Sequence, residues 1–314
     1  MHAPDSLTAF PAFVVAGRKR QATCSDVAWI RGNLLAVANM YGGHVRIYRL
    51  HEDSDGIPTR LELLQEKRGL SLPEGLAVSP DGTLLAAAHS LSHDYGVSLH
   101  AIDGASLALG PTEALCAGRD ECAFHAASFT PDGRHIAYTV IGRALSAEVV
   151  RLKDRALTCR LEQFPAALAP KSITFSADGR FALVALSYIA ADVDTGKYGG
   201  GMLRVHRFDA DSGRVEAAPV AEYRAKGTDL GFLDMAIFLP ATRGETYRIL
   251  ITDQANGLIP AYAFDAAAGT LRPDGVFVDN LSFPHGVDAR ADGRYVAITT
   301  FGDDSVHIAA AAAL

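Results

Sequence analysis

One segment recurs along the chain and constrains its fold more than any other feature. Each copy opens with a polar residue, continues through a small residue and a short alternating strand, and reaches Asp-Gly seven residues later. Asp-Gly is a strong hairpin turn because glycine tolerates a positive φ, and a second apolar strand follows each turn. Four copies align without gaps: Glu74–Gly82, His125–Gly133, Lys171–Gly179 and His285–Gly293.

Two looser copies, beginning at Asp26 and Asp234, complete the series. We call the first residue of each copy its leader, and the leaders recur every 46 to 63 residues. The chain before Asp26 and the chain after His285 together make one more unit of similar length, so the series closes into a circle. Six units of four short strands are typical of a β-propeller.

We therefore predict an all-β fold: residues 1–314 form a single six-bladed β-propeller. The segment from Phe10 to Ala16 should be the outer strand of the blade that begins at His285, because such closure leaves no unpaired edge. The insert from Tyr188 to Gly201 accounts for the longest interval between leaders. Its glycines give it the freedom expected of a lid over the channel mouth.

The overall charge of the 314 residues excludes some partners. The formal net charge is −7 at pH 7, and no basic run is longer than three residues, which argues against a nucleic-acid partner. No stretch approaches the roughly 18 apolar residues that a membrane helix needs, and no signal peptide is recognisable. We expect a soluble, cytoplasmic protein whose partner is a small molecule; its oligomeric state stays open.

The leaders are the best candidates for chemistry. In a propeller the first strand of each blade lines the central channel, so all six leaders should converge at one mouth. Charged side chains are almost never buried unpaired, and clustered acids and imidazoles have perturbed pKa values suited to proton transfer. We expect Asp26 and Glu74 to repel each other as neighbours, so that one of them keeps its proton at neutral pH. The candidate catalytic residues are Glu74, His125, Lys171 and His285. The alternative is a purely structural ring of ion pairs.

A second ring is expected where the second strands end. Blades three and four carry Val140 and Leu186 at that place, which makes one side of the pocket apolar. An organic substrate with one polar end would fit such a pocket. The candidate substrate-binding residues are Asn39, His89, Tyr188, Asp253 and Thr300.

The repeat with its Pro-Asp-Gly-Arg turn resembles the repeats of lactonase-like propellers, and six units resemble the gluconolactonase/SMP-30-like group. That resemblance implies a divalent cation (Ca, Mg, Mn or Zn) at the centre and an activity that opens lactones or related esters. By position, the resemblance implies Glu74, Asp234 and Asp26 as metal ligands. Lys171 stands where that group has an Asn leader.

Three functions follow as hypotheses. The first is a hydrolase that acts on a lactone or related ester with the help of a metal ion. The second is an isomerase, lyase or cyclase that uses the acid and base groups of the ring without a metal. The third is a binding or scaffold propeller without chemistry. The metal content of the purified protein separates the first hypothesis from the second.

Overall fold

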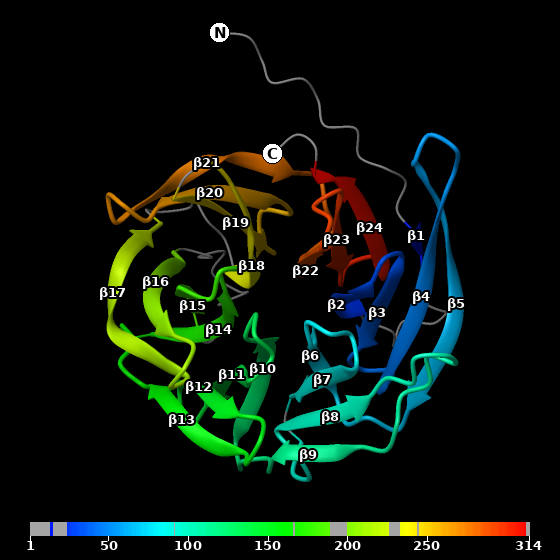
Figure 1. The fold of residues 1–314 in the computed structure, drawn as a ribbon, viewed down its shortest axis with the longest axis horizontal. Helices are drawn as coiled ribbons and strands as arrows, with labels where there is room; N and C mark the ends of the chain where they lie inside the picture. The colour runs from blue at the N-terminus through cyan, green and yellow to red at the C-terminus, as the bar shows by residue number, and fades with distance from the viewer. Residues whose placement is uncertain are drawn as a thin grey trace, which may run out of the picture.

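The computed structural model describes residues 13–14, 24–90, 92–165, 167–188, 200–225, 233–243 and 245–311. These residues form 24 strands in six four-stranded antiparallel sheets, which stand like blades around a central axis (Figure 1). Within the same residues, no helix is long and apolar enough to cross a membrane. The predicted all-β, six-bladed propeller is confirmed.

We number the blades in chain order, and strands are given from the axis outward. Blade 1 contains β2 (Cys24–Arg31), β3 (Leu34–Asn39), β4 (His44–Glu52) and β5 (Pro58–Arg68). Blade 2 contains β6 (Pro73–Val78), β7 (Leu84–His89), β8 (Val97–Ala101) and β9 (Glu113–Cys116). Blade 3 contains β10 (Cys122–Phe129), β11 (His135–Gly142), β12 (Ser146–Arg151) and β13 (Ala156–Leu161).

Blade 4 contains β14 (Leu168–Phe175), β15 (Phe181–Tyr188), β16 (Met202–Asp209) and β17 (Arg214–Arg224). Blade 5 contains β18 (Leu233–Arg243), β19 (Thr246–Asp253), β20 (Ile259–Asp265) and β21 (Thr270–Val278). Blade 6 contains β22 (Pro284–Ala289), β23 (Tyr295–Thr300), β24 (Ser305–Ala310) and, outermost, β1 (Phe13–Val14).

The N-terminal strand closes the ring. Phe13 lies opposite Val306 and Val14 opposite Ser305 in an antiparallel pair. The predicted closure is thus confirmed for these two residues, and the rest of the expected strand lies outside the described residues. The greater part of the insert, residues 189–199, also lies outside them, so the lid stays a prediction.

The Asp-Gly turns form as their sequence predicts. Their glycines adopt φ between 68° and 71°, a conformation that favours glycine. In blade 2 the Ser79 hydroxyl donates to Asp81 Oδ1 at 2.6 Å, and blades 3 and 4 repeat this bond with Thr130 and Ser176. The four glycines are Gly82, Gly133, Gly179 and Gly293.

A β-bulge stands at every leader. In each blade the register between the two innermost strands shifts within the two or three residues around the leader, for example between Pro73 and Gly75 around Glu74. A bulge bends a strand and redirects a side chain. The bulges therefore turn the leaders out of the ordinary alternation of the strand.

The hydrophobic core lies between neighbouring blades. Phe181 of blade 4, for instance, packs edge-on against Phe264 of blade 5 with ring centroids 5.0 Å apart. The innermost strands leave a cavity of about 150 Å³ along the axis. Rigid packing between blades thus fixes the leaders around a narrow channel.

Candidate functional site

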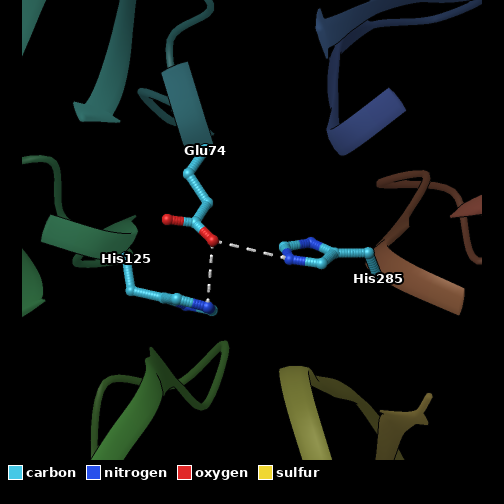
Figure 2. Close-up of side chains that lie close together, drawn as sticks. All are labelled: Glu74, His125 and His285. Atoms are coloured by element: carbon cyan, nitrogen blue, oxygen red, sulfur yellow. Dashed lines mark ion pairs between the residues drawn. The ribbon is translucent and has the colours of Figure 1, made fainter. Parts of the chain in front are cut away.

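Three leaders from blades 2, 3 and 6 point at one another (Figure 2). The Nε2 atom of His125 lies 3.3 Å from Glu74 Oε1, and the Nε2 atom of His285 lies 3.7 Å from the same oxygen. One ligand atom from each of the three residues lies within 4.8 Å of the others. Two imidazole nitrogens and a carboxylate oxygen are a common donor set for zinc and other transition metals.

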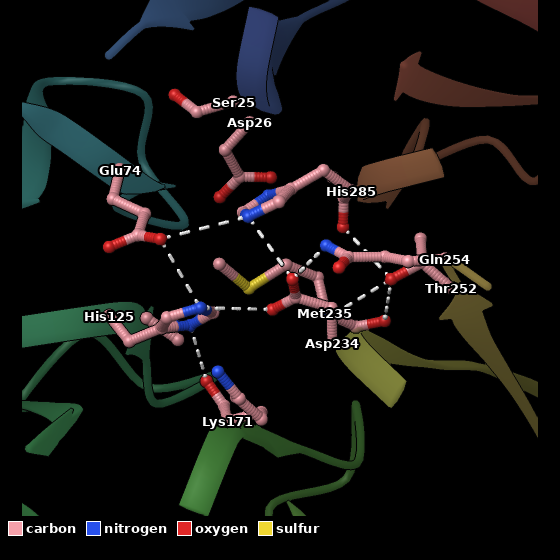
Figure 3. A network of polar contacts seen from close by, with 12 residues as sticks. Ser25, Asp26, Glu74, His125, Lys171, Asp234, Met235, Thr252, Gln254 and His285 are labelled. Atoms are coloured by element: carbon pink, nitrogen blue, oxygen red, sulfur yellow. Dashed lines mark hydrogen bonds and ion pairs between the residues drawn. The ribbon is translucent and has the colours of Figure 1, made fainter. Parts of the chain in front are cut away.

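Asp234 of blade 5 completes a ring of four (Figure 3). Its Oδ1 lies 3.2 Å from His125 Nε2, and its Oδ2 lies 3.1 Å from His285 Nε2. We call Glu74, His125, Asp234 and His285 the tetrad. Acids and imidazoles alternate around it, and the two imidazole rings stack with centroids 5.6 Å apart. The predicted convergence of the leaders is confirmed for these four.

The tetrad is nearly excluded from solvent, because its side chains are only 1 to 10 % exposed. Charges at such a depth are costly unless each is balanced by an opposite charge or by hydrogen bonds. The protonation and ligation of each member therefore follow from its immediate partners.

The tautomer of His125 is set by a backbone carbonyl. Its Nδ1 lies 2.9 Å from the Lys171 carbonyl oxygen, which can only accept, so Nδ1 carries a proton. In a neutral ring, Nε2 then presents a lone pair to Glu74 and Asp234. Burial lowers the pKa of His125, and the nearby charge of Lys171 acts in the same direction. A cation bound between His125 Nε2 and the carboxylates of Glu74 and Asp234 would offset the repulsion among their lone pairs.

The pKa of His285 is shifted in the opposite direction from that of His125. Burial alone would lower its pKa, but the charges of Asp234 and Glu74 outweigh burial and raise it. Its buried Nδ1 has no hydrogen-bond partner within the described part of the chain. When no cation is bound, its stable proton therefore lies on Nε2, between the carboxylates, and a cation would displace it. Two similar groups whose pKa values are shifted in opposite directions by their surroundings are typical of a paired acid and base.

The two carboxylates are oriented by side chains that the sequence analysis missed. Ser90 donates to Glu74 Oε2, and Gln254 donates to Asp234 Oδ2. Burial would raise the pKa of Glu74, but His125, His285 and Lys171 outweigh burial and lower it. Glu74 is therefore held as a carboxylate.

Position in the repeat could have revealed these partners. Ser90 and Gln254 each come one residue after the predicted second ring, and Phe301, whose ring lies 4.1 Å from that of His285, occupies the same place in blade 6. The residues that contact the leaders thus come one residue after the predicted second ring.

Three threonines tie the segments around the leaders of adjacent blades together. Thr252 accepts a bond from Met235 N at 3.0 Å in its own blade and donates to His285 O at 2.9 Å in the next. Each of these threonines comes one residue before the predicted second ring and bridges in the same way. The three are Thr139, Thr252 and Thr299.

Asp26 differs from the metal ligand that the resemblance implies. Its carboxylate accepts bonds from Val27 N at 2.9 Å and from Leu76 N of blade 2 at 2.7 Å, and it lines the axial cavity. Burial raises its pKa to about 8 against the effect of these two donors. The expected neutral acid thus arises from burial and not from repulsion by Glu74. Of the three expected ligands, the structure brings Glu74 and Asp234 together, while Asp26 bridges backbone.

Lys171 lies at the same level in blade 4 and is buried, with 6 % exposure. Its carbonyl oxygen orients His125, and its positive charge lowers the pKa values of both Glu74 and His125. The charge of Lys171 therefore acts on the tetrad. Its catalytic role stays a prediction.

The predicted second ring has the expected place in the repeat. Four of its members end a second strand opposite a residue one or two before the leader: Asn39, His89, Asp253 and Thr300. Val140 and Leu186 hold the equivalent register in blades 3 and 4. Tyr188 ends β15, and the structure does not describe its side chain.

The described side chains of this ring hold the turns of their own blades. Asn39 Oδ1 accepts from Gly42 N at 2.7 Å, and Asp253 accepts from Asn256 Nδ2 at 2.9 Å. His89 bridges the Ser71 carbonyl and the Ser98 hydroxyl, and burial lowers its pKa to about 4. Thr300 donates to its own turn in the same manner. Substrate binding by these residues stays a prediction.

Comparisons with known proteins show the fold alone. No family model matches the sequence, and no curated protein shows significant similarity to it. Among solved structures, Kuenenia stuttgartiensis hydrazine synthase is similar at 16 % identity and a TM-score of 0.60, over 94 % of this chain and 78 % of that chain. An auxiliary nutrient-binding protein of Bacteroides thetaiotaomicron is similar at 10 % identity and a TM-score of 0.61, over 91 % and 68 %. The chain is a six-bladed β-propeller, and its fold does not specify a reaction.

Proposed function

We propose that the protein is a small-molecule enzyme that holds a divalent transition metal ion on Glu74, His125 and His285 and hydrolyses a lactone or related ester. The observation that carries the proposal is the orientation of His125. Its Nδ1 proton is committed to a carbonyl, while its Nε2 faces two carboxylates at 3.2 and 3.3 Å. This arrangement is typical of a ligating histidine fixed by a hydrogen bond to its other nitrogen.

The donor set favours a particular class of cation. Ca²⁺ and Mg²⁺ prefer oxygen ligands throughout, whereas two imidazole nitrogens and a carboxylate suit Zn²⁺, Mn²⁺, Co²⁺ or Fe²⁺. The ion in such a site, when bound, polarises the carbonyl of an ester and lowers the pKa of water.

Side chains around the metal site would carry out proton transfer, stabilise the oxyanion and position the carboxylates. Asp234 Oδ1 accepts no hydrogen bond within the described residues, so it is the group placed to take a proton from the attacking water. The same proton can then pass to the leaving alkoxide when the ester C–O bond breaks. The positive charge of Lys171 favours the oxyanion that forms on the former carbonyl. Ser90 and Gln254 keep the two carboxylates in position.

A second candidate rests on His285. Its raised pKa and unpartnered Nδ1 fit a tetrad that holds a proton in place of a metal ion. An imidazolium beside two carboxylates can donate and accept protons in an isomerase, lyase or cyclase reaction. Metal content distinguishes this candidate from the hydrolase.

The test begins with elemental analysis of protein purified without chelator and of protein dialysed against Zn²⁺ or Co²⁺. We expect one transition metal ion per chain, lost in Glu74→Gln and His125→Asn. His93→Asn is the matched control, because His93 is 85 % exposed and distant in sequence from every leader. A panel of lactones and aryl esters then tests activity. Metal that survives both substitutions contradicts the proposed site, and turnover by metal-free protein favours the second candidate.

A further inference from the structure

Two phenylalanines extend the tetrad on its blade 6 side. The ring of Phe301 lies 4.1 Å from the imidazole of His285, and the ring of Phe283 stacks on Phe301 with centroids 6.2 Å apart and planes inclined by 12°. The separation and near-parallel planes of the two phenylalanines are those of offset aromatic stacking, whereas Phe301 contacts His285 more closely, with the ring planes inclined by 36°. An aromatic surface, which we call the platform, therefore begins where the tetrad ends.

The outer member of the platform has no evident role in stability. Phe283 is 43 % exposed, so it buries only part of its apolar surface. Its φ is 55°, in the left-handed region, which is unfavourable for a bulky L-residue and which Gly or Asn adopts more readily. Neither burial nor backbone conformation favours phenylalanine at this position.

The backbone holds this unfavourable residue firmly. Phe301 N donates to Phe283 O at 3.0 Å, and Gly302 N donates to Ser282 O at 2.9 Å. A side chain at Gly302 would collide with Ser282, so the two segments are in direct contact. The ring of Phe283 is thus presented in a defined place and not on a loose loop.

The position of Phe283 also separates it from other exposed apolar residues. Leu63, Leu157 and Val276 have similar exposures of 47 to 52 %, but they lie on the outermost strands of blades 1, 3 and 5. Phe283 comes two residues before a leader and reaches that leader through a single ring. Phe283 therefore differs from these three residues in its continuity with the tetrad.

We propose that Phe283 and Phe301 bind a flat apolar group of the substrate, so that the substrate carries an aromatic or similarly flat ring next to its reactive carbonyl. This inference rests on the proposed function, because it takes the tetrad as the reacting centre. The polar end of the substrate would face Glu74 and His125, while its ring continues the stack formed by His285 and the two phenylalanines. Aliphatic esters without such a ring would be bound less tightly.

Binding of two hydroxamates to the Co²⁺-loaded protein tests the inference. Benzohydroxamate and acetohydroxamate present the same metal-binding group and differ in the ring, and the cobalt absorption spectrum reports their binding. We expect benzohydroxamate to bind about tenfold more tightly, equivalent to about 1.4 kcal/mol. Phe283→Asn, whose backbone tolerates this φ, should reduce the preference to less than threefold and leave acetohydroxamate binding unchanged.

Two further variants make the result decisive. Phe301→Leu keeps apolar bulk beside His285 and should also reduce the preference. Leu157→Ala removes an equally exposed apolar side chain from blade 3 and should change neither affinity. An equal affinity for the two hydroxamates in the unmodified protein, or a preference that survives both phenylalanine substitutions, would overturn the inference.

Failure of the metal proposal is recognised separately. If the protein takes up no Co²⁺, the platform is tested in the metal-free protein with benzamidine and acetamidine, because the tetrad carboxylates attract an amidinium ion. Calorimetry should then show the same tenfold preference for the aromatic compound and the same loss in Phe283→Asn. No preference in that pair overturns the platform, whereas a preference without cobalt uptake overturns only the metal site.

Discussion

Gly75→Ala tests the link between blade packing and the tetrad. Gly75 follows Glu74, and a Cβ added there would meet the His125 carbonyl oxygen and lie 2.8 Å from Ala126 Cα. Both atoms belong to the backbone of blade 3, and real Cβ atoms almost never approach others within 3.0 Å. Blade 3 must therefore shift, and it carries His125 with it.

The size of the effect follows from this overlap. Overpacking of a well-packed interior costs about 1–3 kcal/mol, and each kcal/mol lowers the Tm of a large domain by about 2–4 °C. We expect the Tm to fall by about 2–12 °C in calorimetry. Metal-ligating side chains tolerate displacements of only about 0.5 Å from their productive geometry, so Co²⁺ should bind at least tenfold more weakly to Gly75→Ala.

The control is Gly104→Ala. An added Cβ at Gly104 meets no atom within 4 Å, and its φ is not in the left-handed region. This substitution should leave cobalt affinity unchanged and should alter the free energy of unfolding by less than about 1 kcal/mol. If Gly75→Ala and Gly104→Ala give the same Tm and the same cobalt affinity, the close approach of blades 2 and 3 does not determine the geometry of the tetrad.

Three other predictions address mechanism, pH dependence and closure. Glu74→Gln and His125→Asn should each lower kcat for the substrate found by screening by about 100- to 10,000-fold and change the Tm by only a few degrees; unchanged turnover would place the chemistry elsewhere. Burial raises the pKa of Asp288 from 3.8 to about 7, so the stability from its buried proton is complete below about pH 4 and is lost as the pH rises through 7. Denaturant titrations should show this fall, and Asp288→Asn should make it smaller, with the remainder due to Asp26; an identical pH profile in the variant would contradict the assignment. Deletion of residues 1–16 should make the protein aggregate because it exposes the edge of β24, whereas deletion of residues 1–10 keeps Phe13 and Val14 and should leave the soluble yield intact.

Much of the fold could be read from local sequence. An Asp-Gly turn between two apolar strands is decided within about ten residues, so the hairpins were predictable copy by copy. The even spacing of the copies then predicted six blades and the closure by the N-terminal strand. The identities of Glu74, His125, Asp234 and His285 as inward-facing leaders followed from their equal place in the repeat.

The contacts among the leaders could not be read in this way. Strand alternation does not reveal the bulges that redirect the leaders, because a bulge changes the side-chain period at one point. The partner of Asp26 is a backbone N–H of the next blade, to which no residue type in the sequence points. Sequence position likewise did not distinguish Ser90 from its neighbour His89, although only Ser90 donates to Glu74.

The sequence by itself determined the propeller and the chemical types that reach its axis, because turns, strand pattern and repeat spacing are local properties. The tertiary structure decided which of those groups meet. Neighbouring blades approach closely enough for the Lys171 carbonyl of blade 4 to hold the Nδ1 proton of His125 in blade 3, and for His285 of blade 6 to reach Asp234 of blade 5. Such distances depend on how six sheets pack around one axis, and no single repeat contains that information.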